Sequence, residues 1–264
     1  MTNSPSKVLV IEDSRAVNVL LSKTIPDQLG LEVDSVTSLR DAIKLLSTQT
    51  TNYITAIVDL NLPDAPNGEV VEALITFGVR PIILTASHSD DMHDEMLEKP
   101  IIDYVVKRNL NEIQYVIDMI KRLKDNFDRK VLVVDDSKSS RLLISSLLER
   151  HYLNVDTAAT GAEALDLLDI NQNYDLVITD FNMPEMDGTE LIAKIRNRYS
   201  RNELPIIGIS SLGSGTISVQ LLKAGANDFI SRPFLHEEFY CRVNQNIDAA
   251  SFYNTLKNKE ALTS

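Results

Sequence analysis

The sequence predicts an α/β protein built from two similar domains, each containing a parallel β-sheet. The chain has 264 residues, which exceeds the usual size of a single domain. Short apolar segments that end on polar residues alternate with segments of helical spacing, and this alternation is typical of parallel strands joined by right-handed crossovers. The same succession of strand ends occurs twice, and an internal repeat indicates two copies of one structural unit.

The composition is that of a soluble globular protein. Hydrophobic residues make up 44% of the chain and the net charge is −12, which argues against a nucleic-acid surface and favours cations or basic partners. Cys241 is the only cysteine, so neither a disulfide framework nor a zinc-ligand set is expected. The first residues lack the features of a signal peptide, and no apolar run approaches the roughly 18 residues that span a bilayer. We therefore expect a cytoplasmic protein that contacts neither nucleic acid nor membrane.

The first copy is predicted to contain five strands, four of which end on polar residues that could take part in chemistry. These strands are expected at residues 8–13, 31–36, 54–59, 81–85 and 104–107. The first ends on Glu12 and Asp13, the third on Asp59, the fourth on Thr85 and the fifth on Lys107. Segments of helical spacing separate them. Asn109, followed by Glu112, has the pattern of a capping box that opens a further helix.

The pattern restarts after residue 127. Asp136 follows Asp13 by 123 residues, Asp180 follows Asp59 by 121, and Arg232 follows Lys107 by 125. We therefore place the first domain at residues 1–127 and the second at residues 128–248. Residues 249–264 are expected to extend the last helix.

In each copy, three carboxylates are expected at one edge of the sheet. They are Glu12, Asp13 and Asp59 in the first copy, and Asp135, Asp136 and Asp180 in the second. Open α/β sheets bind ligands at the carboxyl ends of their strands. Clustered acids repel one another, and Mg²⁺ relieves this repulsion because it prefers oxygen ligands. A magnesium ion beside a carboxylate lets that carboxylate attack a phosphoryl group as a nucleophile.

Each of these residues alone has an ordinary explanation as a solvated loop acid, a strand-end hydroxyl or a surface lysine. Finding an acid pair, a lone acid, a hydroxyl and a base on four strand ends in the same order, twice over, makes coincidence a poor explanation. In the second copy the hydroxyl is Ser210 and the base is Arg232.

This order of residues resembles the receiver domains of two-component response regulators. The segments Met186-Asp187-Gly188 and 224–229 are further hallmarks, and the resemblance covers nearly the whole chain as tandem receivers. It implies two flavodoxin-like, CheY-like doubly wound domains, each with a five-stranded parallel sheet of order 2-1-3-4-5.

The resemblance also implies a role for each residue. Asp59 and Asp180 would accept phosphoryl groups from a histidine kinase or a phosphotransfer protein. The implied Mg²⁺ ligands are Glu12, Asp13, Asp59 and the carbonyl of Asn61, and then Asp135, Asp136, Asp180 and the carbonyl of Asn182. Glu12 and Asp135 would act largely through water. Thr85 and Ser210 would move toward the phosphate, with the switch aromatics Tyr104 and Phe229 turning inward behind them. Lys107 and Arg232 would face the phosphate.

Both copies depart from the lysine-proline pair that receivers usually carry after the last strand. The first has Lys107-Arg108; because a non-proline cis peptide bond costs about 2.5–4 kcal/mol, we predict that this bond is trans. The second has Arg232-Pro233, and arginine is a planar fork rather than a point charge. Arg232 either pairs permanently with Asp180, slows its phosphorylation or substitutes adequately for lysine. We expect Asp59 to be the main regulated acceptor and the second copy to act partly as an adaptor.

The last helix carries a weak apolar stripe. Its members are Phe239, Val243, Ile247, Ala250 and Leu256. Two interpretations of this helix remain open. The helix is either slightly long and packed on its own sheet, or a linker that pairs across a dimer or leads to an output domain. Tandem receivers followed by such a helix resemble the input half of diguanylate cyclases, although no GGDEF motif occurs in these residues.

The sequence therefore favours a response regulator that forms a homodimer on activation. Two alternatives remain. A phosphorylation-independent scaffold of degenerate receivers is supported by Arg232. The other alternative is a small magnesium-dependent phosphohydrolase. Such an enzyme usually needs a second acid two residues after the nucleophile, and the presence of Asn61 and Asn182 at these positions counts against it.

Overall fold

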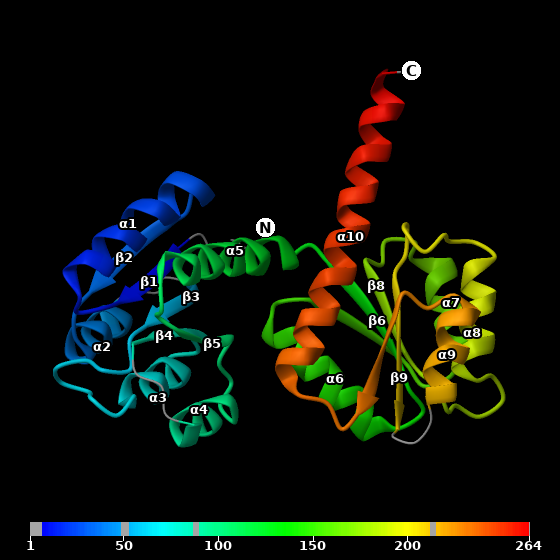
Figure 1. Ribbon diagram of the computed structural model, residues 1–264, viewed down its shortest axis with the longest axis horizontal. Helices are drawn as coiled ribbons and strands as arrows, with labels where there is room; N and C mark the ends of the chain where they lie inside the picture. Colours follow the sequence, from blue (N-terminus) through cyan, green and yellow to red (C-terminus); the bar gives the residue numbers. More distant parts are fainter. Residues whose placement is uncertain (1–6, 49–52, 87–89, 212–214, 264) are drawn as a thin grey trace. The chain divides into compact units, whose positions relative to one another are not determined.

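The computed structural model describes residues 7–48, 53–86, 90–211 and 215–263. Its internal contacts divide the chain into two units, Met1–Phe127 and Asp128–Ser264. Each unit is an α/β domain around a five-stranded parallel sheet (Figure 1). The strand orders are β2-β1-β3-β4-β5 and β7-β6-β8-β9-β10. Both correspond to the order 2-1-3-4-5, so the predicted flavodoxin-like fold is confirmed.

Strands and helices alternate throughout both domains. The first domain contains β1 (Lys7–Ile11), α1 (Arg15–Leu29), β2 (Glu32–Val36), α2 (Leu39–Thr48), β3 (Tyr53–Val58), α3 (Glu69–Thr76), β4 (Pro81–Thr85), α4 (Asp90–Leu97), β5 (Asp103–Val106) and α5 (Leu110–Asn126). The second contains β6 (Lys130–Val134), α6 (Lys138–Arg150), β7 (Asn154–Ala158), α7 (Gly161–Ile170), β8 (Leu176–Asp180), α8 (Gly188–Arg196), β9 (Ile206–Ser211), α9 (Gly215–Ala224), β10 (Asp228–Arg232) and α10 (His236–Thr263). Among the described residues, no helix combines the length and apolarity that a bilayer span requires.

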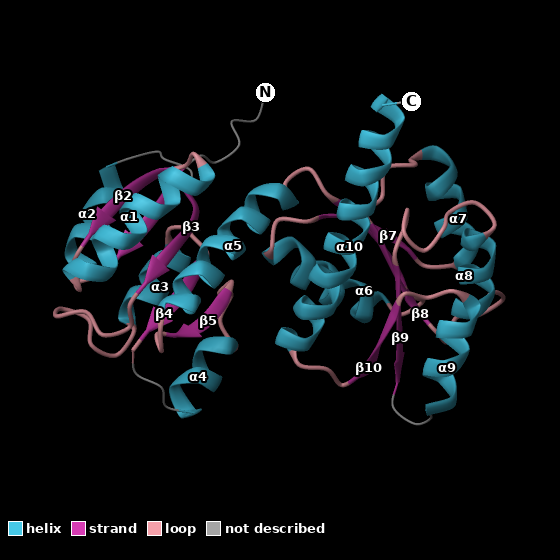
Figure 2. Cartoon of the chain, turned by 45° about the horizontal axis from the view of Figure 1, so that its top comes forward, coloured by secondary structure: helices cyan, strands magenta, loops and turns pink. Residues whose placement is uncertain are grey.

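Helices cover both faces of each sheet, and this explains the continuous apolar strands. Every residue of β3 and β8 is buried, as expected for central strands of a parallel sheet. In the second domain, α6 and α10 lie on one face, and α7, α8 and α9 lie on the other (Figures 1 and 2). Each face has its own apolar core, with Phe239 at the centre of one and Leu191 in the other.

Local signals set the helix ends that position these layers. The capping box predicted at Asn109 is confirmed, because its side chain accepts a hydrogen bond from the Asn111 N–H while its own N–H donates to Glu112 at 2.8 Å. At the end of α1, Gly30 adopts the left-handed conformation with φ of 64°, which glycine tolerates without steric cost.

The terminal helix α10 changes its environment along its length. Phe239, Val243 and Ile247 are buried against the second sheet. Further along, Phe252 and Leu256 are 68% and 45% exposed. The predicted apolar stripe therefore packs on its own domain as far as Ala250 and is open to solvent at Leu256.

A half-buried arginine on α8, Arg196, ties together two loops of the second domain. Arg196 donates to the carbonyls of Gly225 and Leu204 at 2.8 and 2.9 Å, and to the side-chain oxygen of Asn227 at 2.9 Å. These acceptors are neutral, and burial lowers the pKa of Arg196 to about 10. The guanidinium thus supplies a hydrogen-bond donor to two backbone carbonyls and one side-chain oxygen.

Replacing this guanidinium tests its structural role. We expect Arg196→Met to lower the free energy of unfolding of the second domain by about 2–4 kcal/mol, because buried acceptors lose their donor. Urea denaturation followed by circular dichroism measures the change. Arg198→Met is a matched control, since Arg198 is half exposed in an ion pair with Asp169 and should cost less than about 1 kcal/mol. Equal losses of unfolding free energy in the two variants would contradict the structural role assigned to Arg196.

Candidate functional site

The first site lies where β1, β3, β4 and β5 end at the carboxyl edge of their sheet. Backbone hydrogen bonds continue past the strands and fix this edge: the N–H of Asp59 donates to Ile11 at 3.0 Å, and the N–H of Lys107 donates to Thr85 at 2.7 Å. The sheet therefore brings together side chains that lie up to 95 residues apart in the sequence.

The three acids predicted for this site form a close cluster. Glu12, Asp13 and Asp59 each offer a carboxylate oxygen, and these oxygens lie within 4.8 Å of one another. Glu12 and Asp59 are buried, at 1% and 6% exposure, whereas Asp13 is exposed. A set of hard oxygen donors with one side open to water fits Mg²⁺, which binds few carboxylates and retains several waters.

Lys107 bridges the two buried acids. Its Nζ lies 2.6 Å from Glu12 Oε2 and 2.6 Å from Asp59 Oδ2. Burial raises the pKa of Glu12, and the contact with Lys107 opposes this shift. The lysine thus offsets the repulsion and desolvation of carboxylates that the fold places together.

The predicted hydroxyl residue, Thr85, and the predicted switch aromatic, Tyr104, are both buried in the first domain. Thr85 is fully buried, and the side-chain amide of Asn61 lies 3.5 Å from its Oγ1. Tyr104 is only 7% exposed and meets the ring of His93 edge-on at 4.9 Å. Burial raises the pKa of Tyr104, and the nearby charge of Asp59 adds to the effect. Tyr104 therefore occupies an inward position within electrostatic reach of Asp59.

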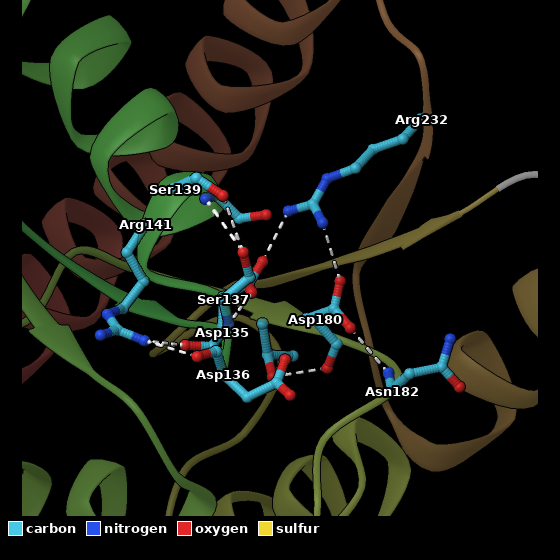
Figure 3. Close-up of polar contacts among 10 residues, drawn as sticks. Asp135, Asp136, Ser137, Ser139, Arg141, Asp180, Asn182 and Arg232 are labelled. Atoms are coloured by element: carbon cyan, nitrogen blue, oxygen red, sulfur yellow. Dashed lines mark hydrogen bonds and ion pairs between the residues drawn. The ribbon is translucent and has the colours of Figure 1, made fainter.

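The second site repeats this plan with an arginine (Figure 3). Asp135 and Asp180 are buried, at 1% and 7% exposure. Arg232 places Nη2 at 2.6 Å from Asp135 and Nη1 at 3.2 Å from Asp180. The guanidinium fork thus spans both acids, and the contact between Arg232 and Asp180, one of the three alternatives considered for this arginine, is present.

The second set of acids is less compact than the first. Among the described acidic residues, Glu12, Asp13 and Asp59 form a group with one carboxylate oxygen each within 4.8 Å of the others. Asp135, Asp136 and Asp180 do not form such a group. Burial and the charge of Asp135 raise the pKa of Asp180 to about 6, while the Asn182 N–H and Arg232 oppose this shift. Asp180 is consequently a less stable anion than a carboxylate in water.

The remaining predicted residues also lie at this edge. Ser210 is buried at 5% exposure near the end of β9, and Phe229 in β10 is half-buried. Asn182 follows β8 and donates its backbone N–H to Asp180 at 2.7 Å, as Asn61 does to Asp59 at 3.1 Å.

The peptide bonds after the last strands of the two domains differ in isomer. Among the described residues, the cis peptide bond is Arg232–Pro233. Lys107–Arg108 is trans, which confirms the prediction based on the energy of non-proline cis bonds.

Two further polar residues at the sites escaped sequence analysis. Asn18 in α1 donates to the backbone carbonyl of Glu12, and Arg141 in α6 donates to those of Asp135 and Asp136. The sequence carries one signal that could have identified them: Asn18 and Arg141 occupy equivalent positions of the internal repeat, 123 residues apart.

Comparisons with known proteins find one kind of domain twice. The family described as response regulator receiver domain matches residues 8–118 and 131–244. Chemotaxis protein CheY1 of Helicobacter pylori is 43% identical over 106 residues, which are 40% of this chain and 86% of that protein. Two-component response regulator ORR3 of Oryza sativa subsp. indica is 38% identical over 103 residues, which are 39% of this chain and 79% of that protein.

A solved structure matches both domains together. It is the crystal structure of a two-component system response regulator/GGDEF domain protein, 41% identical in sequence. The match has a TM-score of 0.83 and covers 93% of this chain and 99% of that one.

The raised pKa of Asp180 predicts a pH-dependent effect of its replacement. We expect Asp180→Asn to increase the free energy of unfolding of the second domain by about 1–3 kcal/mol at pH 8, because the folded state disfavours the carboxylate. The folded pKa of about 6 exceeds the ordinary value of 3.8, so the folded state binds more protons between these values. The stabilisation by asparagine is thus complete above pH 6 and shrinks as the pH falls toward 4. Urea titrations in EDTA at pH 8 and at pH 4 measure the gain in unfolding free energy. Equal gains at the two pH values would refute the effect.

Proposed function

Because the chain belongs to the response regulator receiver family, we propose that it is a phosphorylation-controlled module of a two-component system. Asp59 is the main acceptor of a phosphoryl group from a histidine kinase or a phosphotransfer protein, and Asp180 is a weaker one. The observation that most directly supports this proposal is the first site, where Glu12, Asp13 and Asp59 lie within 4.8 Å and Lys107 bridges two of them.

The proposed reaction transfers a phosphoryl group to a carboxylate. Glu12, Asp13, Asp59 and the carbonyl of Asn61 would hold Mg²⁺, which supplies positive charge against the phosphoryl oxygens. An oxygen of Asp59 attacks phosphorus, and its new bond replaces the bond from phosphorus to the histidine nitrogen. That nitrogen keeps the electron pair and takes up a proton. Lys107 then exchanges its carboxylate contact for a phosphoryl oxygen.

The response to phosphorylation is a shift between two packings of the same side chains. Thr85 would donate its hydroxyl to the phosphoryl group, with Tyr104 held inward behind it. The inward, buried position of Tyr104 supports this coupling. A coupling free energy of about 1–3 kcal/mol is typical of such switches. Ser210 and Phe229 would have the same roles in the second domain.

The second domain differs in the cation at its acceptor. Arg232 and Lys107 contact equivalent acids. Lysine is a point charge on a flexible stem, whereas the guanidinium is a rigid fork bound to both Asp135 and Asp180. Moving the rigid fork away from Asp180 therefore also disturbs its contact with Asp135. We infer that the second domain acts partly as an adaptor, with Asp135, Asp136, Asp180 and the Asn182 carbonyl as the ligands of a weaker Mg²⁺ site.

The output of the module lies outside these residues. We infer that it is a diguanylate cyclase domain, because a similar solved chain belongs to a response regulator/GGDEF domain protein. The exposed Phe252 and Leu256 on α10 support a role for this helix as a linker and as a contact in a homodimer formed on activation. The module is proposed to act in the cytoplasm, without nucleic-acid or membrane contacts of its own.

Labelling with radioactive acetyl phosphate in the presence of Mg²⁺ tests the choice of acceptor. We expect Asp59→Ala to remove most of the label and Asp180→Ala to remove little, since the lysine-bridged site releases its acceptor more readily. Label that survives mainly on Asp180 would defeat this assignment. A chain that takes no label and does not respond to beryllofluoride with Mg²⁺ would instead be a phosphorylation-independent scaffold.

Exchanging the two cations tests why the sites differ. In an Asp59→Ala background, Arg232→Lys should raise the initial rate of labelling at Asp180 by about tenfold, equivalent to roughly 1.4 kcal/mol in the barrier. In an Asp180→Ala background, Lys107→Arg should lower labelling at Asp59 by a similar factor. The two variants are matched controls for each other. Unchanged rates in both would show that the identity of the cation does not set the difference.

A further inference from the structure

One residue in each domain fixes the backbone of the acid pair from the helix that follows it. Asn18 in α1 donates its amide to the carbonyl of Glu12 at 3.0 Å. Arg141 in α6 donates one guanidinium nitrogen to the carbonyls of Asp135 and Asp136, at 2.5 and 3.1 Å (Figure 3). Both residues follow their acid pair by the same number of positions. The shared function of this position is to hold the chain where the first strand of each domain ends.

The two residues do this with different charges. Asn18 is neutral, and its side-chain oxygen accepts hydrogen bonds from Ser35 at 2.7 Å and Ser22 at 3.4 Å. These bonds fix the amide without adding charge. Arg141 instead brings a permanent positive charge to the backbone of the acids themselves.

Within the described part of the chain, the cations that contact the two acid sets therefore differ in number as well as in type. Lys107 contacts the acids of the first domain. Arg232 contacts the acid side chains of the second domain, and Arg141 contacts the backbone of the same acid pair. A lysine can leave the cluster to make room for an incoming ion, whereas Arg141 is held by carbonyls and stays.

We propose that Arg141 is a positioning residue that also weakens the binding of divalent cations at the second site, relative to the first site where Asn18 stands. This inference rests on the proposed function, because it assumes that both acid sets bind Mg²⁺. The physical basis is the repulsion between a unit charge held at the carbonyls of the acid pair and a divalent ion bound by the carboxylates of the same pair. Near a protein surface this repulsion amounts to about one order of magnitude in affinity or more. Arg141 thus preserves the backbone geometry of the acid pair in the second site while lowering the affinity of that site for divalent cations.

Manganese binding to the full chain tests this directly, with the electron paramagnetic resonance of free Mn²⁺ as the readout. Asp13→Ala and Asp136→Ala assign the two binding constants to the two domains. We expect Arg141→Gln, which keeps an amide donor, to tighten the second site by about tenfold. Arg141→Lys, which keeps the charge, should leave that site weak. In the first domain, Asn18→Arg should weaken Mn²⁺ binding by a similar factor.

The outcomes separate this inference from the proposed function. If Asp136→Ala abolishes the second site while Arg141→Gln leaves its affinity unchanged, the metal sites stand and the role of Arg141 is overturned. If neither Asp13→Ala nor Asp136→Ala alters Mn²⁺ binding, the proposed metal sites themselves fail. Should Arg141→Gln not fold, the Asn18→Arg variant decides, since an unchanged affinity of the first site would overturn the effect of the charge.

Discussion

Repulsion between buried carboxylates at the end of a parallel sheet is the constraint on which both domains depend. The fold brings Glu12 close to Asp59, and Asp135 close to Asp180, and all four side chains are nearly inaccessible to water. Buried charges are costly unless they are paired. Each domain therefore supplies a cation at the end of its fifth strand, Lys107 directly after β5 and Arg232 as the last residue of β10. This cation stabilises the resting arrangement, and under the proposed function it would give way to Mg²⁺ and a phosphoryl group.

The duplicated chain shows how one scaffold supports two different sites. The strand order, the backbone bonds that hold the acids and the amide contacts from Asn61 and Asn182 are the same in both copies. The differences lie in the charged groups around the acids, with Lys107 in one copy and Arg232 and Arg141 in the other. Such changes leave the apolar cores intact, so two domains with one fold can diverge in how readily they accept a ligand.

Close backbone packing adds a second constraint at Asp180 in the second domain. A Cβ atom at Gly188 would lie 2.4 Å from the carbonyl oxygen of Asp180. The start of α8 thus presses against the end of β8, and only glycine permits this approach. Asp180 is therefore constrained by backbone packing against Gly188 and by the contact of its carboxylate with Arg232.

The sequence by itself determined the fold and the membership of each site. Alternating apolar segments specify parallel strands, and a parallel sheet gathers the residues at its carboxyl ends whatever their distance in the chain. Glu12, Asp59, Thr85 and Lys107 could therefore be placed together from their positions alone. The sequence also predicted the trans bond after Lys107 from covalent energetics.

Only the tertiary structure decided how these groups meet. Lys107 divides its contact equally between two acids, the second acid set is more widely spaced than the first, and Arg141 reaches the backbone of its acid pair. These features depend on side-chain directions, which are set by packing between elements far apart in sequence. Strand-end position specifies which residues share an edge, whereas the distances between their charges come from the packed helices that surround them.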